Sequence, residues 1–226
     1  MRRLGILLLI IALYALMVPA YPLELRTEDG VRLIGAVLEV EKLDGEKITV
    51  TLGAEGAVTI REVPLGILKV RIVEWKNIPL GYEYTVTPRN STIIVPGIYR
   101  VSVFVQGSRG QALSGARVRI YYGGVPVEEG ITTDGLYTTL LPQGEYRIEA
   151  VYADRISETT LKVEAPREAR ITLDVFVEIG GLPLTQAEFI TIIIIVALLI
   201  LGIYILLYEY GAWRRKRLLA RLAPSS

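Results

Sequence analysis

Two hydrophobic patterns divide the chain. From Tyr21 to Glu178, short runs rich in Val, Ile, Thr and Tyr alternate with Gly, Pro, Asp and Asn. Such runs, at intervals of roughly 8–12 residues, are typical of β-sandwiches and barrels. From Phe189 to Tyr208 the pattern is one uncharged, mostly aliphatic stretch of twenty residues. As a helix, that stretch would cross the ~30 Å hydrocarbon core of a bilayer.

The β pattern follows one plan twice, with seven candidate strands in each half. Three pairs of segments align at offsets of 80, 79 and 78 residues: 33–40 with 113–120, 55–59 with 134–138, and 63–70 with 141–148. A period this long indicates two tandem domains rather than a solenoid. We place their boundary at Pro96-Gly97, because Pro cannot donate to a sheet and Gly bends freely.

Three motifs of the second half carry a family resemblance: Gly115-Ala116 opening a strand, a turn from Thr132 to Tyr137, and Leu-Pro-x-Gly-x-Tyr from Leu141 to Tyr146. The second domain thereby resembles the carboxypeptidase regulatory-like, or transthyretin-like, β-sandwich. The first domain matches more weakly, with Leu68 where the family has Tyr. The resemblance implies a seven-stranded Greek-key accessory module that is not catalytic. The expected fold is all-β: two tandem seven-stranded Greek-key β-sandwiches plus one C-terminal transmembrane α-helix.

The two ends of the chain predict its topology. Arg2 and Arg3 precede a short apolar run, as in a cleavable secretory signal, although an uncleaved anchor has the same pattern. The tail carries a net charge of +4; taking it and the two N-terminal charges from the total of +1 leaves −5 between them. Positive flanks stay cytoplasmic, so the acidic middle is expected outside. The expected segments are a signal (1–20), two domains (21–96 and 97–178), a short stalk (179–188), the membrane helix (189–208) and a cytoplasmic tail (209–226).

Residues at the two ends of the membrane helix predict how it is anchored. Thr185 and Glu188 form a candidate capping box at its start. Aromatic and basic residues of the kind found at headgroups follow it: Tyr208, Tyr210, Trp213, Arg214, Arg215, Lys216 and Arg217. These residues fit a stop-transfer anchor, and the sharper alternative is a helix that binds anionic lipid or a partner.

Composition narrows the chemistry. The chain has no Cys and no His, which excludes disulfides, zinc sites built on these residues, Cys nucleophiles and His bases. Its Asp-Gly pairs fit turns better than calcium loops. We therefore expect no enzymatic activity, metal, cofactor or nucleic-acid partner. Few thermolabile residues with many charged ones favour a thermophilic source.

Two features are candidate surface sites. Asn90-Ser91-Thr92 is an N-glycosylation sequon. The segment from Glu74 to Tyr82 is long for a hairpin and holds Trp75, Ile78, Leu80 and Tyr82. An exposed aromatic and apolar loop would be a binding site. The alternative, which we favour, is that Trp75 folds back over the end of the sandwich as part of the core.

These patterns lead to two function hypotheses. The first is a non-catalytic, membrane-anchored surface protein for adhesion, scaffolding or envelope binding. Its partners would be the lipid bilayer and a surface glycoprotein, a polysaccharide or other membrane proteins. The second is an accessory subunit of a membrane complex for biogenesis or transport. The membrane helix contains no residue that is charged at neutral pH, so conduction through it is not expected.

Overall fold

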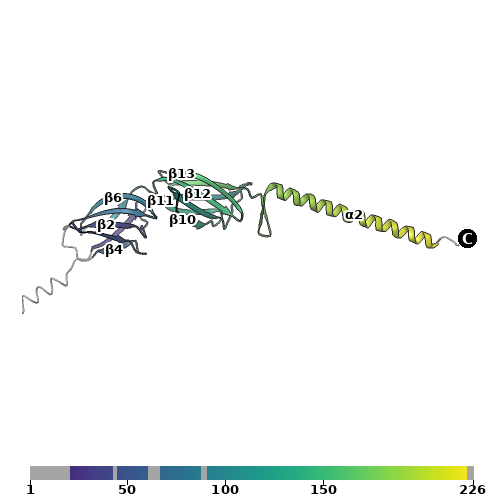
Figure 1. Ribbon diagram of the computed structural model, residues 1–226, viewed down its shortest axis with the longest axis horizontal. Coiled ribbons are helices and arrows are strands. Elements are labelled where there is room, and N and C mark those ends of the chain that lie inside the picture. The colour runs from purple at the N-terminus through teal and green to yellow at the C-terminus, as the bar shows by residue number, and fades with distance from the viewer. Residues whose placement is uncertain (1–20, 43–44, 61–66, 88–90, 223–226) are drawn as a thin grey trace, which may run out of the picture.

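The computed structural model describes residues 21–42, 45–60, 67–87 and 91–222. Within these ranges the chain forms β-strands as far as Leu184 and one long helix after it (Figure 1). The strands are β1 (Tyr21–Thr27), β2 (Val37–Glu41), β3 (Lys47–Thr51), β4 (Ala57–Ile60), β5 (Leu68–Trp75), β6 (Ile78–Val86), β7 (Thr92–Val95), β8 (Ile98–Gly107), β9 (Arg117–Tyr122), β10 (Val125–Ile131), β11 (Leu136–Pro142), β12 (Gly144–Tyr152), β13 (Arg155–Val163), β14 (Arg167–Leu173), β15 (Val177–Ile179) and β16 (Leu182–Leu184), and the helix is α2 (Gln186–Leu222).

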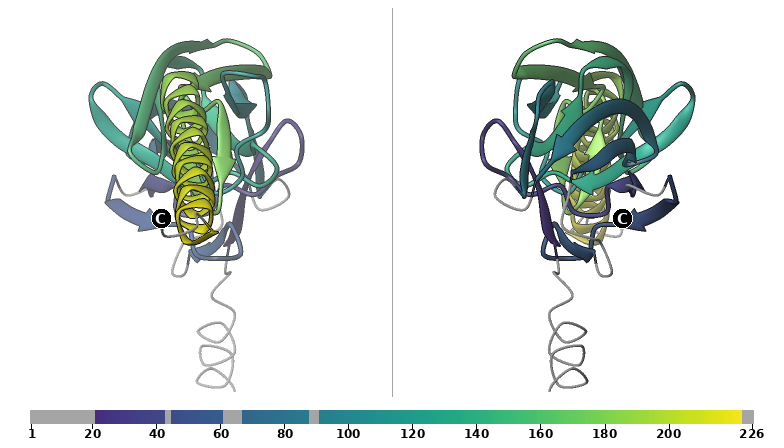
Figure 2. Two further views of the ribbon diagram at one scale, coloured as in Figure 1. Left: turned by 90° about the vertical axis from the view of Figure 1, so that its right-hand side faces the viewer. Right: turned by 90° about the vertical axis from the view of Figure 1, so that its left-hand side faces the viewer.

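The strands before β15 form two bodies that share one topology. The first body (β1 to β7) has sheets in the orders β4-β1-β7 and β3-β2-β5-β6, and the second body (β8 to β14) has β11-β8-β14 and β10-β9-β12-β13. Strands β1 and β8 each lie between an antiparallel and a parallel neighbour. The bodies follow one another along the long axis, and seen along that axis the helix falls within their outline (Figures 1 and 2).

Backbone hydrogen bonds repeat between the bodies as the sheets do. The Leu33 N–H donates to the Leu25 carbonyl, and the Leu113 N–H donates to the Val105 carbonyl, both at 3.0 Å. Further equivalent bonds run from Gly30 to Thr27 and Gly110 to Gly107, from Gly35 to Leu52 and Gly115 to Thr132, and from Leu52 to Ala36 and Thr132 to Ala116. The alignment found in the sequence is therefore a repeat of backbone structure.

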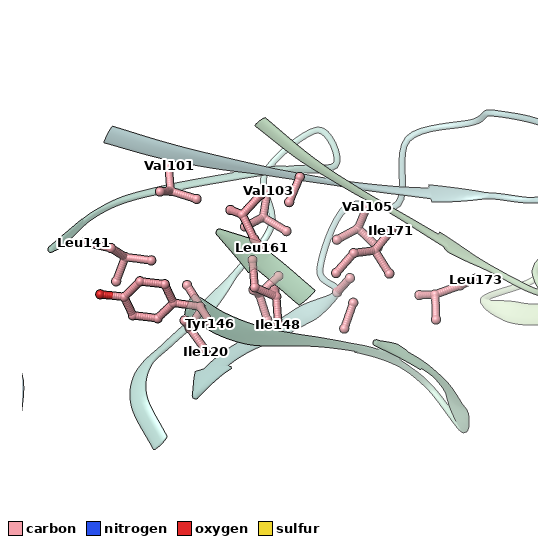
Figure 3. Packing of buried hydrophobic residues seen from close by; sticks show 14 of the residues in the cluster. Val101, Val103, Val105, Ile120, Leu141, Tyr146, Ile148, Leu161, Ile171 and Leu173 are labelled. Carbon is pink, nitrogen blue, oxygen red and sulfur yellow. The ribbon is translucent and has the colours of Figure 1, made fainter. Parts of the chain in front are cut away.

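Each body encloses its own hydrophobic cluster between its two sheets. In β12, Tyr146, Ile148 and Ala150 are fully buried, while Glu145 and Arg147 are exposed. The period-two pattern predicts this alternation, because successive side chains of a strand point to opposite faces. Figure 3 shows residues of β8 and β14 facing those of β9, β12 and β13 across the second core.

Helix α2 is much longer than its apolar stretch. Its 37 residues extend about 55 Å at ~1.5 Å per residue. The part from Gln186 to Arg215 is long and apolar enough to cross a membrane, and none of its apolar core is buried against the rest of the chain. The predicted β class with one C-terminal apolar helix is confirmed.

Two segments differ from the sequence expectation. The loop expected from Glu74 to Tyr82 is wrong, because β5 and β6 continue to a turn of two residues between Trp75 and Ile78. The stalk expected over 179–188 is largely the small hairpin of β15 and β16, followed by the start of α2. Pro79 lies within β6, which tolerates it because β6 is the edge strand of its sheet.

Candidate functional site

The turn between β5 and β6, which we call the inter-body hairpin (Trp75 to Ile78), reaches from one body to the other. Lys76 and Asn77 have φ angles of 52° and 61°, both left-handed. Two successive residues with positive φ form a type I′ turn, whose twist matches that of the two strands it connects. The turn therefore sets Trp75 and Ile78 opposite each other as cross-strand partners.

These two partners enter different cores. Trp75 is 5% exposed, belongs to the cluster of the first body, and donates its indole N–H to the Ile34 carbonyl at 2.9 Å. Ile78 is 1% exposed and belongs to the cluster of the second body. Leu140, from the second body, in turn packs against the first cluster. The hairpin thus closes one core and contributes to the next.

A polar group surrounds the hairpin on the side of the second body. Lys76 forms an ion pair with Glu128 and donates from Nζ to Thr139 Oγ1 at 2.9 Å and to the Leu140 carbonyl at 3.1 Å. Glu128 also accepts a hydrogen bond of 3.0 Å from the Tyr137 hydroxyl. The Lys76 and Glu128 side chains are each 22% exposed, so water screens their attraction less than at an open surface.

Tyr137 supplies a prediction about alkaline pH. Burial and, next, the charge of Glu128 raise the pKa of Tyr137 to about 12. Folding therefore favours the neutral phenol, which stabilises the protein below the ordinary pKa of ~10 and loses this effect as the pH rises toward 12. In a titration followed by tyrosinate absorbance, Tyr137→Phe is expected to remove one late-ionising group.

A second substitution checks the cause of that shift. Glu128→Gln removes the neighbouring charge but leaves the burial, so the pKa of Tyr137 is expected to fall only part of the way to its ordinary value. The parent and Tyr137→Phe proteins are titrated side by side. If the group that the substitution removes ionises near the ordinary pKa of ~10, the assignment is contradicted.

The sequence-predicted binding residues lie at this contact. Leu80 and Tyr82 are partly buried and pack against the first cluster, of which Trp75 is a member. In the structure all four predicted residues pack within this protein. For Trp75 this is the favoured alternative, in which the side chain is part of the core. Binding of an external ligand by this segment stays a prediction. Asn90, the candidate glycosylation residue, lies outside the described residues.

The junction between the second body and α2 is formed by Arg155, Phe176, Thr185, Glu188 and Phe189. The predicted capping box is confirmed: the Glu188 carboxylate accepts from the Thr185 N–H at 2.7 Å, and the Thr185 hydroxyl accepts from the Glu188 N–H at 3.2 Å. Arg155 donates to both carboxylate oxygens of Glu188, at 2.8 and 2.9 Å. The Phe176 and Phe189 rings lie 5.7 Å apart. Strand β13 therefore holds the first turn of the helix directly.

At the other end of α2 the predicted interface residues cluster on the helix. The rings of Tyr210 and Trp213 are 6.0 Å apart, and the Arg217 guanidinium lies 4.0 Å from the Trp213 ring centre. Tyr208 is exposed, as are Arg214 and Arg215, and Lys216 lies in the same helical segment. This grouping suits a headgroup zone, where amphipathic rings and long cations both find partners.

Two further polar regions have balanced charges. A shallow depression of about 410 Å³ lies on the sheet of β2, β3, β5 and β6. Its cations face carboxylates: Lys47 with Glu39, Lys69 with Glu41, and Arg71 with Glu83. Such pairing leaves little net field for a charged ligand. Among the described residues, no group of three His, Cys, Asp or Glu side chains is arranged to hold a metal ion.

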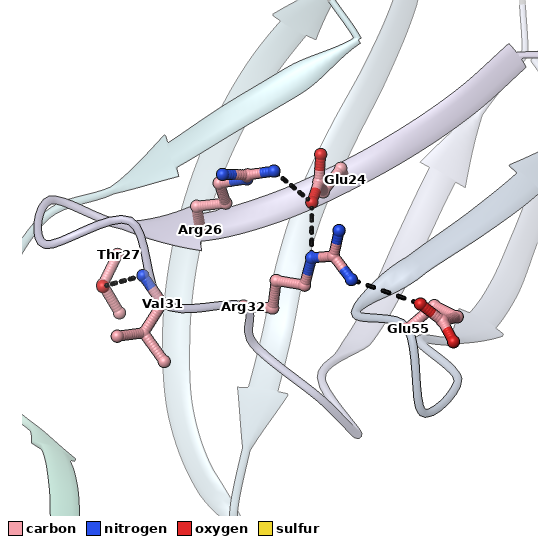
Figure 4. A network of polar contacts seen from close by, with 6 residues as sticks. All are labelled: Glu24, Arg26, Thr27, Val31, Arg32 and Glu55. Carbon is pink, nitrogen blue, oxygen red and sulfur yellow. Dashed lines mark hydrogen bonds and ion pairs between the residues drawn. The ribbon is translucent and has the colours of Figure 1, made fainter.

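The second polar region connects β1 to the turns beside it (Figure 4). Glu24 pairs with Arg26 and Arg32, each at 2.9 Å, and Arg32 also reaches Glu55 at 3.2 Å. The Arg26 guanidinium, assisted by Arg32, holds the pKa of Glu24 below its usual value. These contacts tie β1 to the segments that carry Arg32 and Glu55.

Comparisons with known proteins give only distant likenesses. No protein-family model and no curated protein matches the sequence. Among solved structures, the Bacillus anthracis TIE protein is 18% identical with a TM-score of 0.31, and the match covers 69% of this chain and 33% of that one. The minor pilin GBS52 of Streptococcus agalactiae is 11% identical with a TM-score of 0.32, covering 73% and 99%. The shaft pilin SpaA of Lactobacillus rhamnosus GG is 10% identical with a TM-score of 0.35, covering 70% and 97%.

These likenesses assign no family. The chain spans a third of the length of the TIE protein. A β-sandwich architecture is supported by the paired sheets described above. The narrower carboxypeptidase regulatory-like family, which the motifs suggested, finds no support beyond that architecture.

Proposed function

We propose that this protein is a non-catalytic, membrane-anchored surface module whose two β-sandwich domains form one stiff projection. The domains are residues 21–96 and 97–178, and α2 is their anchor. Both domains lie outside the membrane and the basic tail lies in the cytoplasm. Residues 1–20 direct export as a signal, and the composition reflects a thermophilic source.

One observation carries this proposal: side-chain contacts join the first body to the second and the second body to the helix. The inter-body hairpin places Trp75 and Ile78 in successive cores, and Lys76 bridges to Glu128. Below, Arg155 and Glu188 fasten the second body to the helix. Interfaces between domains usually permit movement unless they are large and hydrophobic. Joints made of packed side chains and ion pairs, one after the other along the chain, instead suit a module that holds a surface at a fixed distance from the membrane.

The partners of such a module would be met on its outer surface. We propose a surface glycoprotein, a polysaccharide or another membrane protein as the partner, and we propose that Asn90 is glycosylated. The charges on the sheet of β2, β3, β5 and β6 are paired. A neutral glycan or a protein surface therefore fits this sheet better than a strongly charged polymer.

Crosslinking of the intact protein in its native membranes, followed by purification, tests the proposal. Recovery of surface glycoprotein or glycan supports a surface module. Recovery of a defined set of integral membrane proteins would instead indicate an accessory subunit of a membrane complex.

Replacement of the apolar stretch 189–208 by polyleucine distinguishes a tether from a subunit of a membrane complex. A tether requires only length and hydrophobicity, so the variant is expected to reach the surface and keep its crosslinked partners. The comparison is made at equal surface abundance, measured by labelling of intact cells. Loss of the partners by a variant that still spans the membrane would contradict the tether and favour the subunit.

A further inference from the structure

The small hairpin of β15 and β16 lies outside both sandwich cores. It projects to one side between the second body and α2 (Figure 1). Gly180 and Gly181 form its tip with φ angles of 61° and 84°. Its strands have only three residues each. Two-stranded hairpins of this size have little stability in water unless another surface covers them.

The exposed side chains beside the tip of this hairpin are apolar. Ile179 and Leu182 are cross-strand partners next to the tip, and they are 50% and 67% exposed. Val177 and Leu184 form the next pair on the same face, because side chains alternate along a strand. One face of the hairpin is therefore aliphatic, although it touches neither core cluster.

The hairpin lies beside the start of the apolar helix, and this position indicates the kind of surface that covers its aliphatic face. Strand β16 ends at Leu184, and α2 begins at Gln186. Phe176, which directly precedes β15, contacts the Phe189 ring at the start of the apolar stretch. The Arg109 guanidinium lies 5.2 Å from the Phe176 ring centre and forms no ion pair with any described carboxylate. An aliphatic tip and an unpaired cation thus lie at the level where the helix would enter a bilayer.

We propose that the β15–β16 hairpin is a second membrane contact, which lies on the outer leaflet and inserts Ile179 and Leu182 among the lipid headgroups. The inference rests on the proposed membrane anchorage of α2. Interfacial segments bury their apolar residues ~5–10 Å into the boundary between headgroups and acyl chains. Arg109 then faces the phosphate layer above the tip. The second body is held by two points, a helix through the membrane and a hairpin on it.

Tryptophan quenching in the full-length protein tests this contact. The protein is reconstituted into phosphatidylcholine vesicles that contain lipid brominated near the top of the acyl chain. In a Trp213→Phe background, Leu182→Trp reports on the hairpin, and Ile94→Trp, at an exposed position of β7 in the first body, is the matched control. Ile179→Trp is a second reporter in case the first perturbs folding, which circular dichroism checks. Trp75 remains as a constant buried background.

The expected result is strong quenching of the Trp at 182, within about a factor of two of the quenching of Trp213 in the parent protein, with none at 94. Quenching of Trp213 without quenching at 182 or 179 would overturn the hairpin contact and leave the anchor intact. If the emission of the Trp at 182 changes with the protein-to-lipid ratio but is not quenched by bromine, the hairpin contacts a second copy of the chain. That result would also overturn the membrane contact. Absence of quenching at Trp213 would overturn the anchor and the hairpin contact together.

Discussion

Trp75→Ala is expected to lower the free energy of unfolding by about 3–5 kcal/mol, the usual range for removing a large buried aromatic side chain. The indole is 5% exposed within the first cluster. Its loss leaves a cavity and also leaves the Ile34 carbonyl without its donor. Denaturation of the intact protein in detergent micelles, followed by far-ultraviolet circular dichroism, measures the change.

Two further variants separate the causes. Trp75→Phe keeps most of the ring and removes the N–H, so its cost is expected to be less than half that of the alanine variant. Ile94→Ala removes an aliphatic side chain that is 60% exposed, and is expected to cost about 1 kcal/mol or less. Equal effects of Trp75→Ala and Ile94→Ala would mean that the inter-body hairpin does not close a core.

Thr132→Val is the second substitution with a large expected effect. Thr132 is 2% exposed; its hydroxyl donates to the Leu113 carbonyl at 2.6 Å and accepts from the Ala116 N–H at 3.0 Å. Valine has nearly the same shape but no hydroxyl, so both backbone groups lose this partner. Each buried polar group left unpaired costs about 1–3 kcal/mol. The same denaturation experiment measures the sum.

Thr160→Val is the matched control, because Thr160 is exposed on β13 and the substitution is the same. We expect it to leave stability nearly unchanged. The first body provides a natural comparison, since Leu52 occupies the position equivalent to Thr132 and is buried without a hydroxyl. If Thr132→Val proved as harmless as Thr160→Val, the hydroxyl bridge would have no role in holding the second sandwich together.

The sequence predicted features whose physical cause is local. The alternation of Tyr146, Ile148 and Ala150 with charged neighbours follows from the geometry of a strand. The capping box required only Thr185 and Glu188 at a spacing of three. The helix followed from an uncharged run of sufficient length. In each case, residues close in the sequence determine the outcome.

The joints could not be predicted in this way, because their partners are distant in the chain. Lys76 meets Glu128 in the other body, and Arg155 meets Glu188 across 33 residues. The Thr-Thr-Asp-Gly motif predicted a turn at Thr132 but not the hydroxyl bridge across 19 residues to Leu113. The hairpin turn was hidden for a different reason: its left-handed positions are filled by Lys76 and Asn77 rather than by Gly.

The fastening of α2 to the second body has a consequence for the response to bilayer thickness. The apolar stretch of twenty residues is about 30 Å long as a helix, which equals the thickness of an average hydrocarbon core. In a thinner membrane such a helix tilts. Because Glu188 is held by Arg155 and Phe189 lies against Phe176, such a tilt is expected to incline the second sandwich. Lipid composition would then set the angle at which the outer domain meets its surroundings.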